Sequence, residues 1–163
     1  MALKAKVLGR EALTRRLNEL APNVEKYAAE AKLKAAKEAA ELIRQKAPVG
    51  ATAEYRDSFV AGRIADNPDK KPVGINQSKD PSAAGIFAEY IWRFLEFGTA
   101  PHSTVTGGGT VLGKKKAATS GKKGHPGTAA QPHIFPTWRS FKPKAMKRVR
   151  AAVNKAVREA MGK

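Results

Sequence analysis

The chain has 163 residues, a formal net charge of +17 and no cysteine. This length suits a single domain spanning residues 1–163, and the lack of cysteine excludes a disulfide framework and thiol chemistry. The charge is uneven, because residues 100–163 hold 14 Lys and Arg against one acid, whereas residues 1–99 hold 17 against 13. The C-terminal part is therefore expected either near a polyanion or an acidic protein surface, or as a solvated basic face.

No segment is typical of a membrane span or a secretory signal. No apolar run approaches the roughly 18 residues that a span needs, and the first residues, MALKAKVLGREAL, have no continuous apolar core. We therefore expect a protein that is made and used inside a cell, or built into a particle there.

Two helices are predicted in the first 46 residues. A leucine stripe indicates the first over residues 10–20. With Asn23 as its N-cap, a second and longer helix should run from residue 24 to about 46, where apolar side chains, many of them alanine, recur at spacings of three and four. Ala47-Pro48 should end it, because the residue before a proline is driven out of the α region.

The middle of the chain predicts a small sheet. In residues 57–77 the strand formers DSFVAGRIA, the turn DNPDKKP and the returning segment VGIN indicate a β-hairpin. Residues 78–85 are predicted as loop. Residues 87–97 favour a short helix over a strand, and Gly98 would be its left-handed terminus.

Residues 100–124 hold six glycines and two lysine clusters. Such a segment is flexible unless a partner orders it, so we predict a flexible basic loop at about 103–124, in which TVLG could form one arm of a hairpin. A last helix is predicted from about Thr137 to Met161, with Pro143 in its first turn or at a kink. The fold class is α+β: long N-terminal and C-terminal helices packed on a small antiparallel sheet, with a long flexible hairpin loop.

Glu96, His102, His125 and His133 are the candidates for a metal or acid–base site. Their spacing does not favour one, since His102 and His125 lie 23 positions apart in Gly- and Lys-rich sequence and no two histidines share a helix face. The sequence contains none of the HExxH, GxSxG, P-loop and GxGxxG motifs. We expect no catalytic residues, no metal and no cofactor, with the histidines in loops beside proline turns.

The lysine clusters and the basic last helix would suffice for non-specific contact with DNA phosphates. Reading of bases would require a presented recognition helix or stacking aromatics, which the clusters lack. A non-specific DNA-binding protein is thus an alternative function. A small hydrolase or nuclease built on Glu96 and the histidines is a third hypothesis.

Four segments in order resemble one known family: AELIRQKAPVGATAEYRDSF, AEYIWRFLEFGT, HPGTAAQPHIFPTW and the final helix. The family is that of the tail-completion proteins of long-tailed bacteriophages, also called neck or head–tail joining proteins. The YRDSF segment departs from the usual Leu-Arg-x-Ser-Ile. The residues that carry the match are Glu96, Phe97, Gly98, Thr99, His125, Pro126, Gly127, Thr128, Pro132 and Phe135.

The resemblance implies a non-enzymatic virion protein that forms a ring, commonly a hexamer, between the head and the tail. It implies a place in the virion neck, with assembly in the host cytoplasm. The implied partners are further copies of the chain, a tail terminator or tail tube protein, and a head-closure or portal-side neck protein. A tail terminator or head-closure protein stays open as an alternative within the same class.

The resemblance also suggests roles for single residues. Glu96 would accept hydrogen bonds from a facing turn and join the two Gly-Thr motifs, or it is an ordinary solvated acid. Four aromatic residues are expected in the core: Trp92, Phe97, Phe135 and Trp138. The loop lysines would contact neighbouring subunits or DNA in the channel, and these are Lys114, Lys115, Lys116, Lys122 and Lys123.

Overall fold

The computed structural model describes residues 11, 14–15, 23–74, 78–104, 110–112, 115 and 124–162. Most of the helix predicted at 10–20 and most of the loop predicted at 103–124 lie outside these residues. The elements are α2 (Asn23–Lys46), α3 (Glu54–Asp57), β1 (Val60–Arg63), β2 (Ala84–Phe87), α4 (Trp92–Phe97) and α6 (Ile134–Ala160). In the described part of the chain, no helix combines the length and apolarity that crossing a membrane requires.

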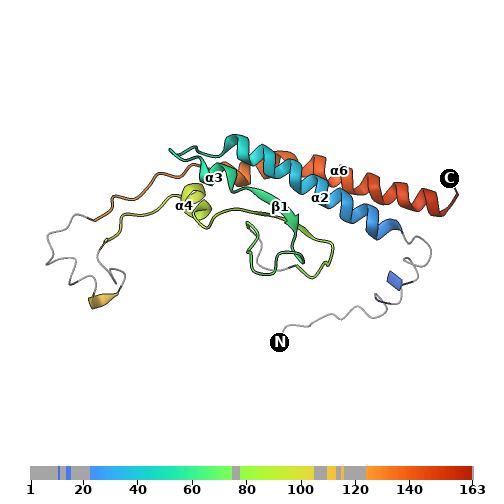
Figure 1. The fold of residues 1–163 in the computed structure, drawn as a ribbon, viewed down its shortest axis with the longest axis horizontal. Coiled ribbons are helices and arrows are strands. Elements are labelled where there is room, and N and C mark those ends of the chain that lie inside the picture. Colours follow the sequence, from blue (N-terminus) through green and yellow to red (C-terminus); the bar gives the residue numbers. More distant parts are fainter. Residues whose placement is uncertain are drawn as a thin grey trace, which may run out of the picture.

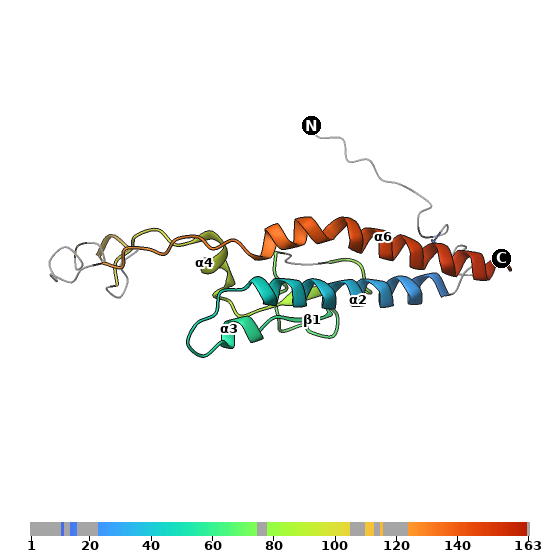
Figure 2. The same cartoon turned by 90° about the horizontal axis from the view of Figure 1, so that it is seen from above.

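The two long helices, α2 and α6, run antiparallel and side by side along the molecule (Figures 1 and 2). Their interface is built from small residues, because Ala35 and Ala39 of α2 meet Phe141 and Ala145 of α6. Alanine allows the helix backbones to approach closely, and the Phe141 ring fills the remaining space. The prediction of a long N-terminal helix with an alanine-rich buried stripe is confirmed.

Polar contacts along one flank set the register of the two helices. Glu38 of α2 accepts from Lys144 at 2.5 Å and pairs with Arg148 at 2.6 Å. These two cations, Lys144 first, hold the pKa of the Glu38 carboxyl below its ordinary value. Near the C-terminal end of α6, Glu159 accepts from the Tyr27 hydroxyl of α2 at 2.7 Å. Exposed pairs of this kind contribute little stability, and their effect here is to favour one alignment.

The sheet differs from the predicted hairpin. β1 pairs antiparallel with β2, with Val60 opposite Phe87, so the partner strand begins in the segment predicted as loop. Of the strand expected at VGIN, Val73 and Gly74 lie in a turn, and the other two residues are outside the described part of the chain. The Val73 N–H donates to the Ile86 carbonyl at 2.7 Å, on the way into a turn at Gly74. Burial explains why Ala84–Phe87 is the segment that pairs with β1, because Phe87 is 5% exposed and anchors β2 in the core.

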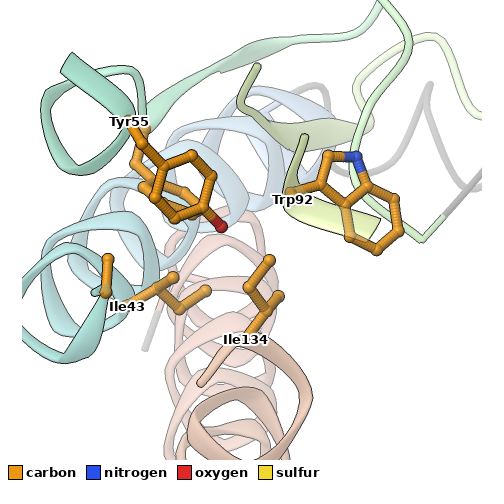
Figure 3. Close-up of a cluster of buried hydrophobic side chains, with 6 residues drawn as sticks. Ile43, Tyr55, Trp92 and Ile134 are labelled. Atoms are coloured by element: carbon orange, nitrogen blue, oxygen red, sulfur yellow. The ribbon is translucent and has the colours of Figure 1, made fainter. Parts of the chain in front are cut away.

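A second cluster joins the sheet and the short helices to the helix pair, and Figure 3 shows its side chains converging from different elements. The labelled residues are Ile43 of α2, Tyr55 of α3, Trp92 of α4 and Ile134 of α6. Ile43 is fully buried, at 0% exposure. This cluster is the only one that ties α3, α4 and the start of α6 together among the described residues.

Two aromatic residues expected in the core are not fully enclosed there: Phe97 is mostly exposed and Trp138 partly so. Phe97 is 65% and Trp138 is 37% exposed, whereas Trp92 is buried and Phe135 is half-buried. Phe97 is the last residue of the six-residue α4, and its ring contacts those of Trp92 and Phe135. Trp138 lies beside the buried stripe of α6, which includes Thr137 and Phe141.

The last helix begins earlier than predicted. α6 starts at Ile134 and not near Thr137, and Pro143 lies inside the helix and not in its first turn. Pro136, in the actual first turn, costs no hydrogen bond because the first N–H groups of a helix have no acceptor within it.

The close packing of α2 on α6 predicts that enlarging Ala39, which is 1% exposed, destabilises the protein. We expect Ala39→Leu to lower the free energy of unfolding by about 1–3 kcal/mol through overpacking. Lys37→Leu, on the exposed face of the same helix, should change it by less than about 0.5 kcal/mol. Urea unfolding followed by circular dichroism measures both, and equal midpoints for the two variants would contradict the packing described here.

Candidate functional site

The residues that carry the two Gly-Thr motifs form an arm. We use this name for residues 98–104 and 124–133, which run side by side away from α4 and α6 and beyond the helix pair (Figures 1 and 2). Two antiparallel bridges join the segments, Thr99 with Thr128 and His102 with His125. Each pair exchanges two backbone hydrogen bonds, at 2.9 and 3.1 Å and at 3.0 and 2.8 Å. The structure therefore brings the two motifs together directly.

Both motifs need their glycine. Gly98 has φ 73° and ψ 179°, so its φ is positive as predicted, but its ψ is not that of the left-handed helical region. Only glycine adopts this conformation readily. A Cβ at Gly98 would lie 2.6 Å from the Thr128 carbonyl oxygen. Gly127, with φ 90°, packs equally tightly against the Thr99 carbonyl.

The carboxylate of Glu96 holds the base of the arm. It is 3% exposed and accepts three backbone N–H groups, from His133 at 2.8 Å, Ile134 at 2.9 Å and Phe135 at 2.9 Å. These N–H groups belong to the start of α6, where they have no acceptor inside the helix and where the helix dipole is positive. Glu96 thus caps α6 from α4. The N–H groups that donate to it lie at the start of α6 and not in the His-Pro-Gly-Thr turn, where they were expected.

His133 completes this junction. It lies outside the helices and next to a proline, as expected, but it is buried directly before α6. It is 4% exposed, its Nδ1 lies 2.6 Å from the Gln131 carbonyl oxygen, and its Nε2 lies 2.7 Å from the Tyr55 hydroxyl. A carbonyl only accepts, so Nδ1 donates to it, and in the neutral imidazole Nε2 then accepts from the Tyr55 hydroxyl. Burial, and to a lesser degree the Glu96 charge, raise the pKa of the Tyr55 hydroxyl.

We call Glu96, His133 and Tyr55 the junction triad. Its hydrogen bonds connect α3, α4 and α6, and Glu96 and His133 are both almost fully enclosed. Every polar atom of Glu96 faces backbone donors, so the arrangement can fix one geometry of the arm root. Over the part of the chain described here, no group of three His, Asp or Glu side chains could hold a metal ion.

The other two histidines lie further out on the arm. The rings of His102 and His125 stack with centroids 5.0 Å apart. His102 Nδ1 lies 3.0 Å from the Ala100 carbonyl, whereas His125 Nδ1 accepts from the Gly127 N–H at 3.0 Å. Although they lie 23 positions apart in the sequence, the bridge makes them direct neighbours.

The loop lysines are mostly outside the described residues. Lys115 is exposed, and nothing is described for Lys114, Lys116, Lys122 and Lys123. Val111, Leu112 and Lys115 are helical, so the expectation that TVLG forms an arm of a hairpin is wrong. Of the remaining motif residues, Pro126 and Pro132 are exposed on the arm.

Two residues of the junction triad were not foreseen. Tyr55 was noted only as a departure from a motif, and His133 was assigned to a loop. One signal for His133 is its position directly before an apolar pair and a proline that suits a helix first turn. For Tyr55 the sequence carries no comparable signal, because its partner lies 78 positions away.

The comparison with family models identifies the class as bacteriophage tail components, on a match over residues 11–98. The chain belongs to the HK97-gp10-like family, described as "Bacteriophage HK97-gp10, putative tail-component". The match includes α2, the sheet and Glu96 and ends at Gly98, so all of the arm except Gly98, and α6, lie beyond it. The comparisons with curated proteins and with solved structures give no match.

The capping role of Glu96 predicts a large effect of its removal. Glu96→Ala would leave three buried N–H groups without an acceptor, and we expect a loss of at least about 3 kcal/mol in the free energy of unfolding. Glu89→Ala, at an exposed site in the same region, is the matched control and should change it by less than about 0.5 kcal/mol. Thermal and urea unfolding measure both; similar losses for the two variants would show that the cap is dispensable.

Gly98 gives a second prediction at the same junction. Gly98→Ala should lower stability by about 1–3 kcal/mol, because the new Cβ meets backbone atoms and the conformation disfavours other residues. Gly50→Ala is the control, since a Cβ there meets nothing within 4 Å. Melting temperatures compare the variants, and an unchanged value for Gly98→Ala would mean that Gly98 does not approach Thr128 in solution.

Proposed function

We propose that the protein is a structural component of the phage neck that completes the tail and joins it to the DNA-filled head. In this role it works as part of a ring of identical subunits and catalyses no reaction. Membership of a phage tail-component family supports the setting. The observation that carries the finer proposal is the arm and the way its root is fixed.

The arm is suited to contacts outside its own subunit. Its two segments pair with each other through two isolated bridges, and most of their described residues beyond Thr99 are exposed. A two-stranded ribbon is marginally stable by itself in water, and its free edges can pair with another chain. The junction triad holds the arm root rigidly, so the arm would reach a neighbouring subunit in a defined direction.

The partners follow from this proposal. They are further copies of the chain in a ring, most simply a hexamer, a tail terminator or tail tube protein on one side, and a head-closure or portal-side neck protein on the other. The site of action is the virion neck, and assembly takes place in the host cytoplasm. A tail terminator and a head-closure protein would use the same features and are the rival proposals within this class.

The pairing of the two arm segments with each other predicts that the residues between them are dispensable for folding. Deleting residues 105–122 should leave the melting temperature within a few degrees, since His102 and His125 are already paired at the base of the deleted segment. The same deletion should abolish or strongly reduce incorporation into particles, measured by electron microscopy of tails and by infectivity. A melted domain, or normal particles, would contradict the proposal.

The experiment that tests the function class is the mass of the purified protein by light scattering, with and without purified tails. A species of low mass that becomes a ring on tails is the expected result. A protein that ignores tails but retains duplex DNA at moderate salt would instead favour the non-specific DNA-binding alternative.

A further inference from the structure

An apolar groove runs along the helix pair from the first residues of α6. It has a volume of about 610 Å³ and lies between α2, α6 and the segment around β2. On α6 its wall includes Trp138, Met146 and Val149. Trp138 is 37% and Met146 is 45% exposed, so large apolar side chains face the open groove. Exposed Trp and Met in a concave surface are typical of binding sites for protein segments.

The two rims of the groove differ in charge. On the α2 side, Lys32 is neutralised by Asp80 at 2.6 Å and also donates to Ser82 at 2.8 Å. On the α6 side stands Arg150, and within the described residues no ion pair is found for it. The rim of α2 is therefore neutral and the rim of α6 is positive.

The positive rim continues into the solvent face of α6. At 100° per residue, Arg139, Lys147 and Arg150 lie within one quadrant of the helix, opposite the buried Phe141 and Ala145. Other cations of α6 do have acidic partners: Glu38 pairs with Lys144 and Arg148 on a different flank, and Glu159 pairs with Lys155. Cations of the solvent face are thus uncompensated in the described structure, directly beside the apolar groove.

We propose that this groove binds an amphipathic helix of another protein, with apolar side chains against Trp138 and Met146 and with carboxylates beside Arg150 and Arg139. The wall from Trp138 to Arg150 is about 18 Å long at 1.5 Å per residue, the length of about three helical turns. A helix in an apolar groove presents anchors at i, i+3, i+4 and i+7. This inference adds a class of partner to the proposed function and does not depend on it.

The positive rim of the groove favours an acidic helix of another protein over segments of this chain, which are basic. The net charge of +17 disfavours a second copy against a positive rim. Residues 1–22 hold five Lys and Arg against two Glu, so they too are basic. DNA would use the cations of α6 but has nothing to place against Trp138 and Met146. Only an acidic segment with an apolar face satisfies both features at once.

The test uses the full-length protein and labelled peptides of about 15 residues, a length of about four helical turns. The probe has Leu at i, i+3, i+4, i+7 and i+11 and mostly Glu elsewhere. One control peptide has the same composition scrambled, and a second has Lys in place of each Glu. Fluorescence anisotropy should show binding of the probe at least about tenfold tighter than of either control, a difference of about 1.4 kcal/mol.

Variants locate the binding site. Met146→Asp and Arg150→Glu should each weaken probe binding about tenfold, whereas Arg158→Glu should change it less than about twofold. Arg158 is an exposed cation of the same helix but does not line the groove, so it matches Arg150 in the charge removed. Circular dichroism checks that all three variants are folded.

Three results would overturn the inference. Equal binding of the probe and its scrambled control, or equal losses in Arg150→Glu and Arg158→Glu, would show general attraction of anions to α6. Absence of probe binding would show that the groove takes no such helix. A fall in the mass of the protein by itself on Met146→Asp would show that a second copy occupies the groove. None of these results would touch the proposed role in the neck, which is tested by assembly on tails.

Discussion

Three backbone N–H groups at the first turn of α6 donate to one carboxylate, that of Glu96, which comes from α4 and is almost fully buried. A buried charge is costly unless it is well bonded, and here the donors and the positive end of a long helix supply that compensation. This interaction fixes where α6 begins and how it lies against α4. Since Gly98 and the arm follow Glu96 directly, the same contact also sets the direction in which the arm leaves the body.

The body beneath the arm is built from small residues. Alanines of α2 let α6 approach closely, and few large side chains fill the space between the helices. The larger apolar and aromatic residues gather at one end, in the cluster of Ile43, Trp92 and Ile134 beside the junction triad. Stability is therefore concentrated near the arm root, which suits a protein whose proposed work is to transmit the position of an arm to a neighbour.

The surface of α6 has two flanks that differ in how their charges are paired. One flank is neutralised by α2 through Glu38, and another carries uncompensated cations beside an apolar groove. The sequence shows the excess of charge, but the separation into paired and unpaired cations exists only once α2 lies beside α6. The arm and the groove would then offer two different surfaces to two different kinds of neighbour.

The sequence by itself determined the long helices, because periodic alanines, the Ala47-Pro48 stop and the apolar spacing of the last helix are local signals. It also determined the α+β class and the requirement for glycine at Gly98. Only the tertiary structure decided which strand pairs with β1, since the burial of Phe87 outweighed the turn signal of DNPDKKP, which lies nearer to β1 in the sequence. The acceptor role of Glu96 at α6, the enclosure of His133 and the contact with Tyr55 were decided there too. These contacts join residues more than 35 positions apart, and their geometry depends on how whole helices pack, which no local pattern encodes.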